Sequence, residues 1–337
     1  MYLCSAFEKI DMKKLILAIA ILGLAALSSG AQEIRTNYRS GRTTHISTDY
    51  EELVSGGTPV WIRVEKAGFQ DGSSIFLLYL NFEQKTSTNV PKGVKMAFNL
   101  ASGGMVRAEQ IGTDSATKRA ITRGGNKVYW NRTKYALEKA DMDKILRGVT
   151  SIDVVTGWNP DDYIQMSFPT DELSALLKRH ADAINKAAPA TIDLTAELGS
   201  RANNRNNILT TSKPMTARGA SFAYNVFLTH LYYKNTNQEE FDLSMQVGTD
   251  KTYHISIDSP VEFTLADGRK ITLKQAHDED NRFTVFPSMR ELRLLCGGIK
   301  AISISYDGGT ITDTFSGKAL SGVINQQYQL LMSVSDR

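Results

Sequence analysis

Basic and aromatic residues are interleaved in one short segment of this chain. Residues 114–134 contain six lysines and arginines but only one acidic residue, Asp114, which leaves a net charge of +5. Positive charge attracts anionic ligands, and flat aromatic faces stack on sugars or bases. We therefore expect this segment to bind an anionic, ring-bearing ligand. Its candidate ligand-binding residues are Arg119, Arg123, Lys127, Tyr129, Trp130 and Arg132.

The same segment has a simpler structural interpretation. Residues 121–130 form a hairpin pattern around a Gly-Gly-Asn turn. A solvated hairpin whose Trp130 folds back onto its own domain would show the same pattern. Both interpretations remain open at the level of sequence.

Other residue patterns that could support chemistry are weak. The five histidines form no His-Glu-x-x-His or His-x-His arrangement, and His277-Asp278-Glu279-Asp280 has the character of a solvated turn. The chain contains no Gly-x-Ser-x-Gly elbow and no complete phosphate-binding loop. We therefore expect no catalytic residues, no metal and no cofactor.

The segment belongs to a chain that repeats itself. Residues 76–111 match residues 241–276 at a spacing of 165, so that Phe98 corresponds to Phe263. The spacing becomes 150 at Gly148 and Gly298, and then 147 at Ile164 and Ile311. It changes only where loops are expected, as in a duplicated domain. The first copy holds 15 additional residues between Gly103 and Gly148, and these include most of the basic segment.

Each copy has the periodicity of a small antiparallel sheet with two helices. Apolar residues alternate along residues 76–82 and 222–228, and Asp267-Gly268 is typical of a hairpin turn. Strand pairs are expected over 149–155 with 163–168, and over 299–306 with 310–315. The fold class is thus α+β, with two tandem copies of one domain.

Two helices are expected in each copy, one short and one long. Ser288 and Glu291 form a capping box at the start of a short helix, whose first-copy counterpart covers residues 141–146. An amphipathic helix closes each copy, capped by Thr170 in the first. His180 and Gln327 lie at the edge of the two apolar stripes, which indicates a role in packing.

The N-terminal residues have the pattern of a secretory signal. Met12-Lys13-Lys14 precedes an apolar run to Leu27, followed by small residues up to Ala31. We expect cleavage after Ala31, with residues 1–11 an upstream extension. No cysteine stands at the cleavage site for a lipid anchor. The protein is therefore expected to be exported, to the periplasm or outside the cell, without a membrane-spanning anchor after cleavage.

The remaining boundaries follow from composition. Residues 32–58 are interpreted as a polar arm, 59–187 as the first repeat, 188–220 as a connector and 221–337 as the second repeat. Removal of residues 1–31 leaves one cysteine, Cys296, and hence no internal disulfide. The net charge of the whole chain is +3, which is too close to neutral to indicate a nucleic-acid partner.

These features favour an exported, non-enzymatic binding module for an acidic glycan or an envelope component. The shared positions form apolar framework, whereas paired active sites would leave matching polar residues in both copies. Two alternatives remain open: a hydrolase with a single site between the repeats, and a protein inhibitor or assembly partner that presents its sheet. An exposed aromatic patch including Tyr232 and Tyr233 would favour a protein partner.

Overall fold

A computed structural model describes most of the chain after the expected signal segment. The described residues are 32–84, 90–112, 120–123, 126–157, 162–169, 171–204, 207–233 and 238–334. For residues 120–128 only the backbone is described. The signal segment predicted over residues 1–31 and the helix cap predicted at Thr170 lie outside these residues.

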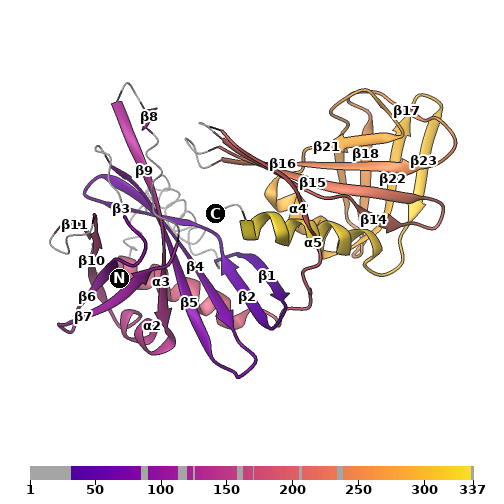
Figure 1. Cartoon of the computed structure of the whole chain (residues 1–337). Helices are drawn as coiled ribbons and strands as arrows, with labels where there is room; N and C mark the ends of the chain where they lie inside the picture. The colour runs from indigo at the N-terminus through magenta and orange to yellow at the C-terminus, as the bar shows by residue number, and fades with distance from the viewer. Residues whose placement is uncertain are drawn as a thin grey trace, which may run out of the picture.

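The first half of the molecule is built on one large antiparallel sheet (Figure 1). Its strands follow the order β1-β2-β4-β5-β9-β7-β6-β10-β11, with β3 paired to β4 and β8 paired to β9. The elements are β1 (Ile34–Ser40), β2 (Thr43–Thr48), β3 (Glu51–Ser55), β4 (Thr58–Gly68), β5 (Ser74–Gln84), β6 (Lys95–Leu100), β7 (Met105–Gln110), β8 (Ala120–Arg123), β9 (Asn126–Glu138), α2 (Lys139–Ile145), β10 (Val149–Val155), β11 (Tyr163–Ser167) and α3 (Glu172–Lys186).

The second half divides its strands among separate antiparallel sheets. One has the order β12-β13-β15-β16-β21 with β14 paired to β15, another has the order β19-β18-β22-β23, and β17 pairs with β20. The elements are β12 (Leu198–Asn203), β13 (Asn207–Ser212), β14 (Met215–Arg218), β15 (Ala223–Tyr233), β16 (Gln238–Gly248), β17 (His254–Ile255), β18 (Pro260–Leu265), β19 (Lys270–Lys274), β20 (Glu279–Asp280), β21 (Arg282–Val285), α4 (Met289–Gly297), β22 (Ile299–Tyr306), β23 (Gly309–Thr314) and α5 (Ala319–Val334).

Each half buries a hydrophobic core of its own. In the first half, α2 and α3 pack on the sheet and enclose side chains such as Phe82 and Phe98. In the second half, α4 and α5 enclose Phe241, Phe263 and their neighbours. Helix α5 also contacts β1, so it lies where the two halves meet (Figure 1). The molecule thus belongs to the mixed α+β class, dominated by antiparallel sheet.

The expected hairpins and helices are present. The turn at Asp267-Gly268 joins β18 to β19, and β10 pairs with β11 as β22 does with β23. The capping box of Ser288 and Glu291 forms at the start of α4. Cys296 packs against the second core, as expected for a small apolar side chain.

Strands also form in the polar arm and in the connector. Residues 34–55 form β1, β2 and β3, and residues 198–218 form β12, β13 and β14. Some of their buried positions hold hydroxyl side chains, beside apolar ones such as Leu53 and Ile208. Thr36 and Ser47 are buried and share a 2.6 Å hydrogen bond, and Thr210 and Ser212 are also buried. Buried hydroxyl side chains interrupt the apolar alternation by which a sequence reveals a strand.

Candidate functional site

The basic-aromatic segment forms the predicted hairpin. Strands β8 and β9 pair antiparallel, with Thr122 opposite Lys127 and Arg123 opposite Asn126. This pairing places Arg123 and Lys127 on the two strands of the hairpin. Arg119 lies outside the described residues. Tyr129, Trp130 and Arg132 follow along β9.

The pleat of β9 divides the predicted ligand-binding residues between two faces. Neighbouring residues of a strand point to opposite sides, so Tyr129 and Trp130 cannot form one flat patch. Trp130 is only 6% exposed and packs on Trp61 of β4, with ring centroids 4.6 Å apart. Arg132 shares the face of Trp130, and its guanidinium carbon lies 4.5 Å from the centre of the Tyr232 ring. The structure thus places Trp130 and Arg132 on one face of the sheet and Tyr129 on the opposite face.

Further aromatic and basic side chains share the face of Trp130 and Arg132. Strand register places Trp61, Asn81 and Arg132 in one row, and Arg63, Tyr79 and Lys134 in the next. All lie opposite the core face, which carries Ile62 and Leu80. We call this surface the polar face; it comprises Trp61, Arg63, Tyr79, Asn81, Trp130, Arg132 and Lys134.

Burial varies across the polar face. Trp61, Arg132 and Lys134 are half-buried and so keep contact with solvent. Arg63 and Tyr79 are buried, and the guanidinium carbon of Arg63 lies 3.8 Å from the Tyr79 ring centre. Lys134 Nζ lies 4.9 Å from the same ring centre. Cations therefore pack on aromatic faces across three adjacent strands.

A buried carboxylate organises one end of the polar face. Glu65 lies 2.9 Å from His45 Nδ1, accepts a 2.7 Å hydrogen bond from the Tyr79 hydroxyl and lies 3.9 Å from Arg63. Burial alone would raise the pKa of Glu65, but His45, Arg63 and Tyr79 together lower it to about 2. Glu65 is therefore ionised at neutral pH and holds Tyr79 and Arg63 in place.

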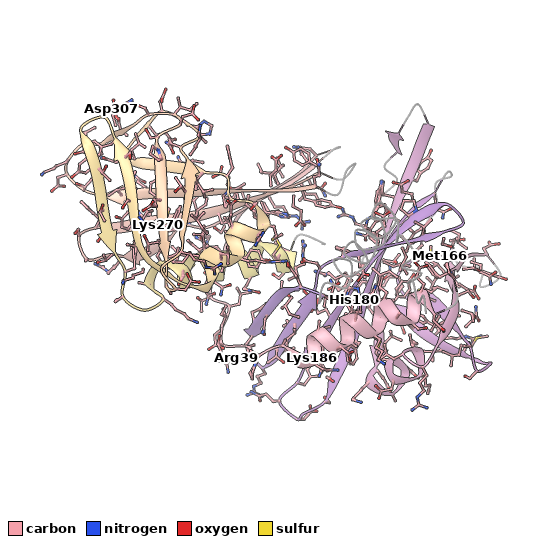
Figure 2. All side chains as sticks on the ribbon, turned by 180° about the vertical axis from the view of Figure 1, so that it is seen from behind. Arg39, Met166, His180, Lys186, Lys270 and Asp307 are labelled. Carbon is pink, nitrogen blue, oxygen red and sulfur yellow. The ribbon has the colours of Figure 1, made fainter. Side chains whose placement is uncertain are left out.

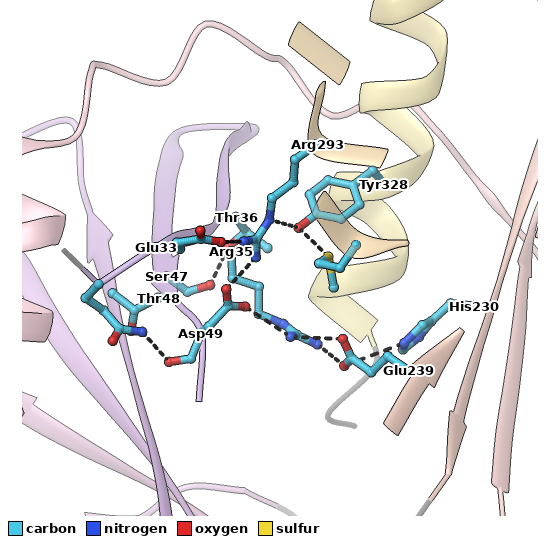
Figure 3. Close-up of polar contacts among 12 residues, drawn as sticks. Glu33, Arg35, Thr36, Ser47, Thr48, Asp49, His230, Glu239, Arg293 and Tyr328 are labelled. Atoms are coloured by element: carbon cyan, nitrogen blue, oxygen red, sulfur yellow. Dashed lines mark hydrogen bonds and ion pairs between the residues drawn. The ribbon is translucent and has the colours of Figure 1, made fainter. Parts of the chain in front are cut away.

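A second charged cluster joins the two halves of the molecule (Figure 3). Arg35 of β1 is buried and forms a 2.6 Å ion pair with Glu239 of β16, and it lies 3.4 Å from Asp49. His230 Nε2 lies 3.6 Å from Glu239. Burial would raise the pKa of Glu239, but Arg35 and His230 hold it well below the usual carboxylate range.

Residues of helices α4 and α5 extend this charged cluster. We call the whole cluster, including the residues from both helices, the junction. Arg293 of α4 pairs with Glu33 and, at 2.5 Å, with Asp49, while its Nε donates to the Tyr328 hydroxyl of α5. The backbone amide of Asn37 donates to the Gln329 side chain, which also lies on α5. Opposite charges thus neutralise one another across the junction, and this arrangement is suited to holding two bodies together.

His180 takes part in an arrangement that superficially suits nucleophilic catalysis. Its Nδ1 lies 2.6 Å from the Thr48 hydroxyl, and its Nε2 lies 3.7 Å from Glu51. However, His180 of α3, labelled in Figure 2, and Thr48 of β2 are both fully buried. Burial lowers the pKa of His180 to about 3. A substrate has no access to this hydroxyl, so the contact secures α3 to the sheet, in agreement with the packing role expected from the sequence.

Gln327 stands at the matching place in the second half. It is buried on α5, and its amide nitrogen donates 2.6 Å to the Val226 carbonyl of β15. In both halves, therefore, one polar side chain secures the closing helix to its sheet.

The acidic stretch after β19 includes strand β20, and its His277 and Asp278 are exposed to solvent. His254 lies 2.8 Å from Asp280, and both side chains are exposed. Within the described part of the chain, no three His, Cys, Asp or Glu residues are grouped so as to hold a metal ion.

Comparison with protein families, with curated proteins and with solved structures found no match to this chain. Among the described residues, no helix has both the length and the apolar character needed to cross a membrane.

Sequence reasoning identified Trp130 and Arg132 but missed Trp61, Arg63, Tyr79 and Lys134 as their neighbours. A signal was available, because Trp61 and Arg63, like Tyr79 and Asn81, alternate with apolar residues along their strands. Only the pairing of β4, β5 and β9 shows that these positions share one face.

Proposed function

We propose that this chain is an exported, non-enzymatic binding module for an acidic glycan or a similar envelope component. The proposal depends on one observation: the polar face places half-buried Trp61 on β4 and half-buried Arg132 and Lys134 on β9, the two strands that flank β5 in one sheet. Aromatic faces stack on sugar rings, and guanidinium and ammonium groups bind carboxylates. The ligand-binding surface is thus broader than the hairpin alone, and it includes β4 and β5.

We also propose that the two halves are copies of one ancestral domain. Strand register supports this, because equivalent pairs recur at the spacings of the sequence. Phe98 pairs with Ile152 as Phe263 pairs with Ile302, and Val154 pairs with Ile164 as Ile304 pairs with Ile311. After a duplication, the two copies share their framework and differ elsewhere. The polar face of the first half, with its extended β9, is the feature in which the two halves differ.

The compartment belongs to the same proposal. The N-terminal segment has the pattern of a cleaved secretory signal, so the mature protein would meet its ligand in the periplasm or outside the cell. Acidic polysaccharides and glycolipids are common there. Nucleic acid is not part of the proposal, since the overall charge is close to neutral.

The test is retention of the mature chain on an immobilised acidic polysaccharide across a salt gradient. Arg132→Ser with Lys134→Ser should weaken binding roughly tenfold and lower the eluting salt concentration, because two charged contacts are lost. Arg119→Ser, Arg123→Ser and Lys127→Ser together should have a smaller effect if β4, β5 and β9 carry the site.

Lys251→Ser supplies the matched control, since Lys251 is exposed and lies in the second half. It removes one positive charge far from the polar face and should elute like the wild type. Failure of the wild-type chain to bind any acidic polysaccharide would overturn the proposal.

A further inference from the structure

The second half of the molecule has an outward sheet face of its own, on strands β15, β16 and β21. Strand register places Phe227, Ser244 and Thr284 in one row across these strands. They alternate with core residues such as Leu243, so they point away from the core. Phe286 directly follows β21 and continues this alternation. This face therefore ends in an aromatic residue that no core encloses.

The two most exposed large apolar side chains among the described residues lie close to this end of the face. Phe286 is 59% exposed and Ile257 is 55% exposed. Both flank one short segment, because the His277 ring meets Phe286 edge-on with centroids 6.4 Å apart, and the Ile257 amide donates to the Asp278 carboxylate. Single exposed apolar residues are common on protein surfaces, whereas neighbouring ones indicate a surface that a partner covers.

Carboxylates surround these two apolar residues. Asp278, Glu279 and Asp280 are consecutive in the chain, and Asp242 on β16 is near enough to Glu279 for their charges to interact. Within the described part of the chain, Arg282 is the only lysine or arginine ion-paired with any of these four, at 3.6 Å from Glu279. The surroundings of the apolar residues therefore carry an excess of negative charge.

The combination of apolar exposure and negative charge favours one class of partner. The carboxylates would repel anionic lipid headgroups, although exposed apolar side chains alone would suit a membrane. They would repel an acidic glycan in the same way. A protein segment that combines lysine or arginine with an apolar side chain matches both properties of the surface.

We propose that this surface, which we call the acidic face, docks a basic segment of a partner protein. The acidic face comprises Asp242, Ile257, Asp278, Glu279, Asp280 and Phe286. An apolar side chain of the partner packs against Phe286 and Ile257, while its lysines or arginines pair with the surrounding carboxylates. This inference goes beyond the proposed function, since it concerns another surface and a partner of the opposite charge.

The experiment measures fluorescence anisotropy of three labelled peptides of equal length with the mature chain. One combines lysine with leucine, the second combines glutamate with leucine, and the third combines lysine with serine. The wild type should bind the lysine–leucine peptide about tenfold more tightly than either of the others, because only this peptide offers both charge and apolar surface. Added salt should weaken the binding, since part of the attraction is between charges.

Substitutions on the acidic face separate the two contributions. Phe286→Ser with Ile257→Ser should weaken binding of the lysine–leucine peptide about tenfold, because the apolar contacts are lost. Asp278→Asn with Asp280→Asn should also weaken it and should make the remaining affinity less sensitive to salt. Asparagine retains a side-chain carbonyl oxygen, so the bond from the Ile257 amide can persist in this variant.

Matched controls change similar residues on the first half. Met105→Ser removes an exposed apolar side chain, and Asp182→Asn removes an exposed carboxylate. Both should bind the lysine–leucine peptide like the wild type. Equal wild-type affinity for the lysine–leucine and glutamate–leucine peptides, or unchanged affinity in Phe286→Ser with Ile257→Ser, would overturn the inference. Binding to anionic phospholipid vesicles that is lost in this double variant would also overturn it, because the face would then meet a membrane.

Discussion

Single polar residues at buried positions stabilise this fold through specific hydrogen bonds. His180 and Gln327 occupy the inner sides of the closing helices and bond to strands beneath them. The two side chains differ in one physical respect, because only histidine can acquire a proton. Since burial lowers the pKa of His180 to about 3, the folded protein keeps this imidazole neutral over most of the pH range.

His180→Gln should remove a pH dependence from stability. In the unfolded chain, histidine takes up a proton near pH 6.5, whereas in the folded protein it does so only near pH 3. The unfolded state therefore binds more protons between these values, and the contribution present above pH 6.5 is lost as pH falls, by up to about 1.4 kcal/mol per pH unit. Urea denaturation at pH 8, 6, 5 and 4 should show a shallower decline for the variant than for the wild type. Parallel declines would contradict this account of His180.

At the scale of elements, the helices begin in different ways. The Ser288 hydroxyl accepts from the Glu291 amide, and the Glu291 carboxylate accepts from the Ser288 amide, so two donors at the start of α4 are satisfied. Helix α2 starts at Lys139, and Glu138 at its N-cap position makes no side-chain cap hydrogen bond, so its stability comes from packing of Met142 and Ile145. Helix α4 therefore depends on a local signal that α2 lacks.

Ser288→Ala should lower the free energy of unfolding by about 1 kcal/mol, because it removes the hydroxyl that accepts from the Glu291 amide and donates to the Glu291 carboxylate. Ser288→Gly is the matched control, since glycine at this position usually costs only a few tenths of a kcal/mol. Thermal unfolding of the two variants and the wild type provides the measurement. Equal losses for alanine and glycine would show that the cap does not account for the effect.

At the scale of the whole molecule, ion pairs link two halves that each have a separate hydrophobic core. The junction brings Arg35 to Glu239 and Arg293 to Asp49, with distances of 2.6 and 2.5 Å. Arg35 is buried, so its charge depends on these carboxylates for compensation. The orientation of the halves, and with it the contact between Arg132 and Tyr232, depends on this cluster.

Glu239→Gln should destabilise the junction by about 3 kcal/mol, because it leaves Arg35 buried with less compensation. Since each half has its own core, calorimetry should show the single unfolding transition of the wild type separating into two. Replacing both partners, with Arg35→Met and Glu239→Met, should recover much of the loss, because no uncompensated charge then remains. A single unshifted transition in Glu239→Gln would rule out this role for the ion pair.

The local pattern of the sequence was sufficient for much of the fold. Alternating apolar residues located the long strands, Asp267-Gly268 located a hairpin, and the helical stripes located α3 and α5 together with the packing role of His180. These features depend on neighbours within a few residues, so periodicity and turn chemistry report them directly. Strands β1 and β2 were not located, because polar residues such as the hydrogen-bonded pair Thr36 and Ser47 occupy buried positions in them.

Only the tertiary structure shows which residues come together at the candidate site. Trp130 was visible in the sequence, but its contact with Trp61, and that of Arg132 with Tyr232, follow from strand order and from the meeting of the two halves. Glu239 pairs with Arg35 across 204 positions of the chain. A local periodicity carries no information about residues so far apart in the chain, because their pairing depends on how complete sheets pack once each core has formed.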